Sequence, residues 1–251
     1  MTLSYGTQEL DAVVFDLDDV LVPFQTPAAW QWAWRPQGPL LGERRVKAAV
    51  RRALKSWDRR RWNGVTGKAP PVDVAALRAH LAETLAAVAG HSLPPAETEA
   101  VVRRFLRPSG EVERYADVAR VLDQLRGRSV RFGTVTPLPG ESARWLLHRT
   151  GLADIALLGT GDGPGPSVPD RAAFRSAAEA LGAPAERVAY VGDLFWSDVR
   201  AAARAGLAAV LLDRRDAWPK VQTGRLTTLD DLVTTLATGG SPPESDSGDG
   251  E

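Results

Sequence analysis

Two carboxylates lie two positions apart at the end of an apolar run near the N-terminus, in the segment VVFDLDD at residues 13–19. Such a run is typical of a buried strand in a parallel sheet, so Asp16 and Asp18 would emerge together at its carboxyl end. Paired acids at a sheet edge can hold a divalent cation, and one can act as a nucleophile or an acid. Two acids after a strand can equally form a solvated turn.

Two later apolar runs also end in polar residues. Thr136 follows one of them, and Asp193 and Asp198 follow the other. Carboxyl ends of parallel strands meet at one edge of the sheet, so these side chains would gather with the first acidic pair. Several acids in one place repel each other unless a cation neutralises them, and a threonine hydroxyl beside them can hold a phosphate oxygen.

Short apolar runs alternate with segments of helical periodicity over most of the chain. This alternation predicts an α/β fold, a doubly wound parallel sheet of Rossmann-like type with helices on both faces. The predicted strands are Ala12–Phe15, Val130–Val135, Ile155–Leu158, Val188–Val191 and Ala208–Leu212. The predicted helices between them are Val118–Leu125, Glu141–Arg149, Arg171–Leu181 and Asp198–Ala205.

Residues 24–110 depart from this alternation, because their periodicity is helical and no strand pattern interrupts it. The predicted helices there are Glu43–Trp62, Val74–Val88 and Ala96–Leu106. We expect an all-helical cap over 24–110, inserted after the first strand of an α/β core made of 1–23 and 111–238. Residues 239–251 are rich in Gly, Ser, Pro and acids, which predicts a disordered acidic tail.

Composition narrows the class of protein. The 251 residues include 31 basic and 31 acidic side chains and no cysteine, which argues against a general nucleic-acid binder and excludes disulfides and thiol chemistry. No signal segment and no apolar run of membrane-spanning length are found. We therefore expect a cytoplasmic protein, a monomer or a homodimer, that binds a small molecule and neither nucleic acid nor a membrane.

Taken in order, Asp-x-Asp, a strand ending in Thr and a strand ending in Gly-Asp-x-x-x-x-Asp resemble the haloacid dehalogenase-like superfamily over residues 12–236. The resemblance implies a Mg²⁺-dependent phosphatase that hydrolyses a small phosphorylated metabolite through an aspartyl-phosphate intermediate. Asp16 matches the nucleophile, Asp18 the acid/base and Thr136 the phosphate-binding hydroxyl. The implied Mg²⁺ ligands are Asp16, Asp18 through its main-chain carbonyl, Asp193 and Asp198.

The chain departs from the family pattern at three positions. Val168 stands where the family usually has a lysine that offsets the charge of the nucleophile and holds the phosphate. Arg171 or Arg175 on the following helix can substitute in principle, since arginine also binds phosphate. Pro137 stands where an asparagine often follows the threonine, and Asp19 where a glycine is common.

The missing lysine leaves a second interpretation open, a degenerate family member that binds a phosphorylated ligand or a partner without turnover. A phosphomutase uses the same pair of acids and is a further alternative. A 2-haloacid dehalogenase is disfavoured, because a halide leaves unprotonated and Asp18 would have no task.

The expected cap holds two more ambiguous features. The cations of 43–62 either attract an anionic substrate or form a solvated helix face, and the second interpretation is favoured. Trp30 and Trp34 either stack on a ligand or pack in the cap core, and packing is favoured. The three histidines have no metal-ligand spacing.

Overall fold

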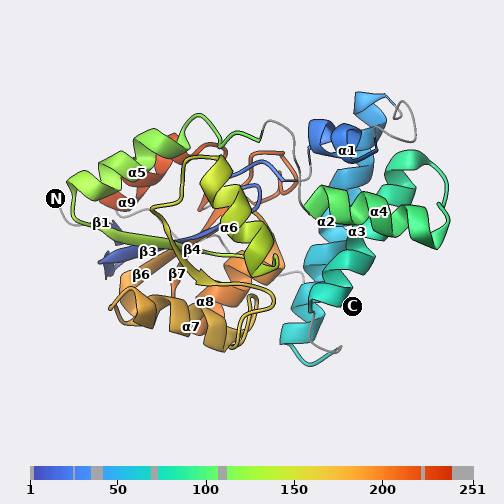
Figure 1. Ribbon diagram of the computed structural model, residues 1–251. Coiled ribbons are helices and arrows are strands. Elements are labelled where there is room, and N and C mark those ends of the chain that lie inside the picture. Colours follow the sequence, from blue (N-terminus) through green and yellow to red (C-terminus); the bar gives the residue numbers. More distant parts are fainter. Residues whose placement is uncertain are drawn as a thin grey trace.

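The computed structural model describes residues 3–24, 26–34, 42–68, 73–106, 112–221 and 224–238. Its central sheet has six parallel strands in the order β5-β4-β3-β6-β7-β8 (Figure 1). These strands are β3 (Ala12–Asp16), β4 (Arg131–Val135), β5 (Ala156–Gly159), β6 (Val188–Gly192), β7 (Ala208–Leu212) and β8 (Arg225–Leu226). The predicted α/β parallel sheet is confirmed, and the five predicted strands agree to within one residue at each end.

Three short strands were not predicted from the sequence. β1 (Leu3–Tyr5) and β2 (Gln8–Leu10) form a separate antiparallel hairpin, and β8 extends the sheet beyond β7. With two or three residues each, these strands are too short to show an alternation of apolar and polar residues.

The sheet separates two apolar clusters, and β3 contributes to both. Val13 and Phe15 belong to one cluster, whereas Ala12 and Val14 belong to the other. The first is covered by α5 (Val118–Gly127), α6 (Gly140–Arg149) and α9 (Leu232–Ala237), and the second by α7 (Arg171–Ala180) and α8 (Ala201–Ala205) (Figure 1). Burial on both faces explains why β3 is apolar at every position until Asp16.

The strand register brings the polar strand ends to one edge. β3 lies between β4 and β6, with Asp16 opposite Val135 and Phe15 opposite Val191. Thr136 and Asp193 therefore follow the neighbouring strands at the same edge as Asp16.

Four further helices gather beside the sheet rather than on its faces (Figure 1). They are α1 (Pro27–Trp34), α2 (Glu43–Val65), α3 (Val74–Ala89) and α4 (Pro95–Leu106). The three predicted helices are confirmed, with α2 three residues longer than expected. Trp30 is fully buried and stacks on Phe105 with 4.1 Å between ring centroids, which confirms its packing role.

We call α1–α4 the helical unit. The expected domain limits at 24 and 110 stay a prediction, and the expected tail at 239–251 lies outside the described residues. Within the part of the chain that the structure describes, no helix has the length and apolarity needed to cross a bilayer.

Candidate active site and metal centre

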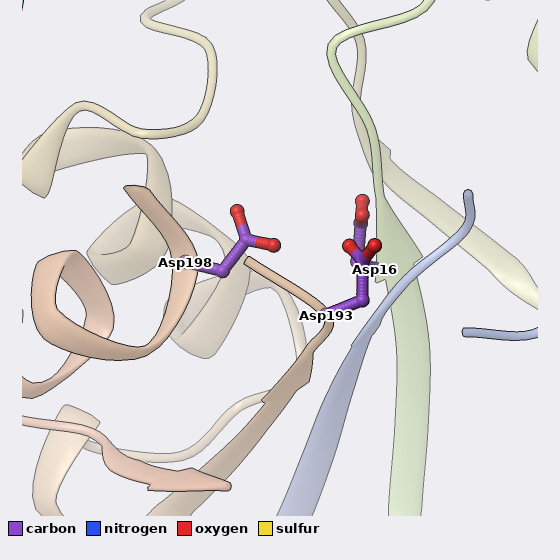
Figure 2. A group of neighbouring side chains, drawn as sticks. All are labelled: Asp16, Asp193 and Asp198. Carbon is purple, nitrogen blue, oxygen red and sulfur yellow. The ribbon is translucent and has the colours of Figure 1, made fainter. Parts of the chain in front are cut away.

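Three carboxylates meet at the carboxyl edge of the sheet (Figure 2). Asp16 ends β3, Asp193 follows β6, and Asp198 lies in η3 (Phe195–Arg200), a π-helix that continues into α8. Each offers an oxygen atom, and the three oxygens lie within 4.8 Å of one another. The structure therefore brings together three of the acids predicted to be metal ligands, and a π-helical turn is a common feature of functional sites.

A glycine allows Asp198 to approach the sheet this closely. A Cβ at Gly192 would lie 2.5 Å from Cβ of Asp198 and 2.9 Å from its Oδ2. The backbone N–H of Leu194 donates a hydrogen bond of 3.1 Å to the same Oδ2 and holds the carboxylate in place. The glycine of the sequence motif is thus required by packing at this position.

Burial and mutual repulsion disfavour the ionised forms of these acids when no cation is bound. Burial, followed by the charges of Asp198, Asp18 and Asp193, raises the pKa of Asp16 well above its usual value. Burial also raises the pKa of Asp193 and of Asp198. Among the described residues, Oδ1 of Asp16 is buried and has no hydrogen-bond partner. A set of carboxylate oxygens with an unsatisfied buried acceptor fits Mg²⁺, which prefers oxygen ligands.

Asp18 and Thr136 lie together next to this cluster. The Thr136 hydroxyl donates a 2.9 Å hydrogen bond to Oδ2 of Asp18 and accepts one of 3.1 Å from the Leu138 N–H. Burial raises the pKa of Asp18 to about 7, although the hydrogen bond from Thr136 opposes the shift. A carboxyl group with a pKa near neutrality can both give and take a proton at physiological pH.

Asp19 has a structural role that explains the departure from the family pattern. Its φ of 58° lies in the left-handed region, which favours glycine but which aspartate tolerates better than most residues. Its carboxylate accepts a 3.1 Å hydrogen bond from the Phe24 N–H and forms an ion pair with Arg215. Asp19 thereby anchors the loop that follows β3.

The position of the missing lysine is apolar in its surroundings as well as in its side chain. Val168 is buried in a cluster that includes Ala173 and Phe174. Nε of Arg175 donates a 3.3 Å hydrogen bond to the Ala205 carbonyl at the end of α8, which gives this guanidinium a structural partner. Arg171 is exposed in the first turn of α7, and its phosphate-binding role stays a prediction.

Helix α2 contributes two buried charged residues that were not predicted. Arg61 is 2% exposed, and its Nη1 lies 3.4 Å from Oδ1 of Asp198. Asp58 is fully buried and accepts hydrogen bonds from the backbone N–H groups of Trp196 and Ser197, at 3.0 and 2.6 Å. Helix α2 thus contacts the segment between Asp193 and Asp198, the two candidate metal ligands after β6.

A signal for Arg61 was present in the sequence. The buried apolar stripe of α2 runs through Val46, Val50, Leu54 and Trp57, and the next position at this spacing is Arg61. The solvated-face interpretation is wrong for Arg61, which is 2% exposed. The exposed cations, for which that interpretation stays a prediction, are Arg44, Arg45, Lys47, Arg51, Arg52, Lys55 and Arg59.

Comparisons with known proteins agree with this architecture. Residues 10–206 match the family model of haloacid dehalogenase-like hydrolases. A phosphoglycolate phosphatase of Rhodospirillum rubrum is 30% identical over 228 residues, covering 88% of each chain.

Two solved structures share the fold. The HAD-hydrolase YfnB of Bacillus subtilis, described as bound to magnesium, has a TM-score of 0.67 at 20% identity and covers 93% of this chain and 99% of its own. A 2-haloacid dehalogenase of Pseudomonas syringae has a TM-score of 0.54 at 24% identity and covers 91% and 99%. With its motif residues at one sheet edge and a family match over most of its length, the chain belongs to the haloacid dehalogenase-like hydrolases.

Proposed function

We propose that this hydrolase is a Mg²⁺-dependent phosphatase of a small phosphorylated molecule. The observation that carries the proposal is the convergence of Asp16, Asp193 and Asp198 within 4.8 Å, beside the hydrogen-bonded pair of Asp18 and Thr136. In this arrangement Asp16 would act as the nucleophile, Asp18 as the proton donor and the cluster of acids as the cation site, which are the parts that phosphoryl transfer requires.

In the first step, a carboxylate oxygen of Asp16 attacks phosphorus and the bond to the ester oxygen breaks. Asp18 gives its proton to that leaving oxygen, so the product departs as an alcohol. The Thr136 hydroxyl donates its single hydrogen to Asp18 in the unliganded site, and it would donate that hydrogen to a phosphoryl oxygen when the substrate is bound.

In the second step, Asp18 accepts a proton from water, and the water oxygen attacks phosphorus of the aspartyl-phosphate. The bond between phosphorus and Asp16 breaks, which releases inorganic phosphate and restores both carboxyl groups. Asp16, Asp193 and Asp198 would hold Mg²⁺, which supplies positive charge against the phosphoryl oxygens when bound.

The name of the 30% identical relative suggests a first substrate to test, 2-phosphoglycolate. The test measures phosphate release from this compound and from a panel of small phosphate esters, with Mg²⁺ and with EDTA. We expect Mg²⁺-dependent release that Asp16→Asn abolishes, because an amide cannot attack phosphorus. An Asp16→Asn protein with wild-type turnover and unchanged melting temperature would refute Asp16 as the nucleophile.

One observation favours a second candidate, a phosphate-ester binder without turnover. Val168 stands where the family pattern has a lysine, and it is buried in an apolar cluster. Tight binding of a phosphorylated molecule with no phosphate release under any metal condition would support this function. Halide release from a 2-haloacid without Mg²⁺ would instead indicate a dehalogenase.

A further inference from the structure

The proposed phosphatase needs a positive charge near its nucleophile, and position 168 cannot supply it. The four lysines of the sequence are Lys47, Lys55, Lys68 and Lys220, all distant in sequence from that position. Phosphoryl transfer gains its rate largely from charges positioned against the phosphoryl oxygens. A cation from another element is therefore expected if the chain turns over phosphate esters.

Arg61 has the position and the free donors for this task. Its Nη1 lies 3.4 Å from Oδ1 of Asp198, and among the described residues its Nε and Nη2 are buried without a hydrogen-bond partner. A guanidinium carries five N–H donors, and leaving several of them buried and unpaired is costly. Oxygen atoms of a bound anion would satisfy them.

The electrostatics of Arg61 point to the same edge of the sheet. Burial by itself would lower the pKa of Arg61, but the charges of Asp198 and Asp16 outweigh it and raise the pKa above its usual value. In return, the Arg61 charge opposes the rise in the pKa of Asp16 and of Asp18. The contact that places the guanidinium at this edge is the one between its Nη1 and Oδ1 of Asp198.

Asp58 fixes the helix that carries Arg61. The two residues lie three positions apart on α2 and so share a face of the helix. The Asp58 carboxylate accepts from the N–H groups of Trp196 and Ser197, which lie between the metal-binding acids Asp193 and Asp198. Contact through these two hydrogen bonds sets how far Arg61 reaches into the acidic cluster.

We propose that Arg61 is a phosphate-binding catalytic residue that replaces the missing lysine from a different element, with Asp58 as its positioning residue. The proposal rests on the phosphatase function for its effect on turnover, but the binding of phosphate can be tested without it. Arginine suits the role because its planar fork can donate to two phosphoryl oxygens at once.

The primary experiment measures binding of inorganic phosphate by calorimetry in the presence of Mg²⁺. We expect Arg61→Met to weaken binding by roughly 10- to 100-fold, which is typical for loss of a charged hydrogen bond. Arg59→Met is the matched control, since Arg59 is exposed on the same helix and should bind phosphate like the wild type. Arg61→Lys keeps the charge and is expected to fall between them.

Binding of Mg²⁺ itself gives a readout that a merely structural role would not move. Removing a positive charge 3.4 Å from Asp198 lessens the repulsion of the metal, so Arg61→Met should bind Mg²⁺ more tightly than the wild type while it binds phosphate less tightly. Unchanged phosphate affinity in a folded Arg61→Met or Arg61→Lys protein would overturn the proposal. If the wild type hydrolyses no ester yet Arg61→Met loses phosphate binding, the phosphatase function fails and the phosphate-binding role of Arg61 stands.

A double-mutant cycle tests the positioning role of Asp58. Asp58→Asn should weaken phosphate binding in the wild-type background, because α2 is held less firmly against η3. In the Arg61→Met background the same substitution should have no further effect on phosphate binding. Equal effects in both backgrounds would show that Asp58 acts only on the fold.

Discussion

The close approach of Asp198 to β6 makes Gly192→Ala a sharp test of the metal site. The added Cβ would lie 2.5 Å from Cβ of Asp198, and ordinary contact begins near 3.4 Å, so Asp198 must retreat by 3.4 − 2.5, about 0.9 Å. The added Cβ cannot move away from Asp198 instead, because Cε1 of Tyr190 would lie only 2.8 Å from that added Cβ. Misplacing a catalytic group by about 1 Å costs on the order of 10²-fold in rate.

The assay compares Mg²⁺ affinity and phosphate release in Gly192→Ala with those of Gly127→Ala. Gly127 ends α5, and a Cβ there meets nothing within 4 Å, so this control should behave like the wild type. We expect Gly192→Ala to lose both Mg²⁺ affinity and about 10²-fold in turnover while it remains folded by circular dichroism. Wild-type Mg²⁺ affinity in a folded Gly192→Ala protein would refute the reasoning that Asp198 is a ligand placed by this glycine.

The other predictions concern the metal, the missing lysine and pH. Saturating Mg²⁺ should raise the melting temperature by several degrees relative to EDTA, since a ligand at 100 times its Kd adds about 2.7 kcal/mol; an equal rise in Asp193→Ala would contradict the assignment. Val168→Lys should raise turnover by less than roughly 3-fold, because Arg61 already supplies a charge. The same substitution should destabilise the fold by about 2 kcal/mol or more, because it buries an ammonium group. A large acceleration would show that position 168 limits the rate. Burial lowers the pKa of His80 from 6.5 to about 4, so the unfolded chain binds more protons than the folded chain between these values. The free energy of unfolding therefore falls as the pH drops from 6.5 to 4, by at most about 3.4 kcal/mol. In denaturant titrations, the free energy of unfolding of His80→Gln should fall less over this pH range than that of the wild type. The control His148→Gln, at an exposed site, should follow the wild type. Parallel curves for His80→Gln and the wild type would contradict the role assigned to His80.

The histidine prediction also bears on the helical unit. His80 is 1% exposed and stacks on Trp57 at 4.7 Å between ring centroids, and the Trp57 ring lies 6.0 Å from the Arg61 guanidinium carbon. Protonation of this imidazole would place a charge within the packing that supports Arg61. Acid is therefore expected to loosen α2 and α3 as a pair.

Much of the core could be predicted because its signals are local. The apolar strands β3, β6 and β7 are buried on both faces, so each is written as an uninterrupted apolar run. The polar residues that follow must then meet, because parallel strands end at a common edge. Asp16, Thr136 and Asp193 follow from this rule alone, without knowledge of any distance.

Strands β1, β2 and β8 were missed because they are too short for a sequence pattern to reveal them. They have two or three residues each, and their pairing with neighbours rather than their own pattern makes them strands. The sequence left open whether Trp30 stacks on a ligand or packs in the core. The structure shows that helix α1 places its ring against Phe105.

By itself, the sequence determined which chemistry is available: an acidic pair after the first strand, a threonine after another, two more acids, and no lysine at position 168. Only the tertiary structure decided which cation stands beside those acids. The helical spacing of α2 puts Arg61 on the buried stripe, but this spacing does not say which distant residues that stripe faces. The docking of α2 through Asp58 onto η3, more than 130 positions away in the chain, buries Arg61 against Asp198. Such a contact depends on how two distant elements pack, and no local pattern encodes that distance.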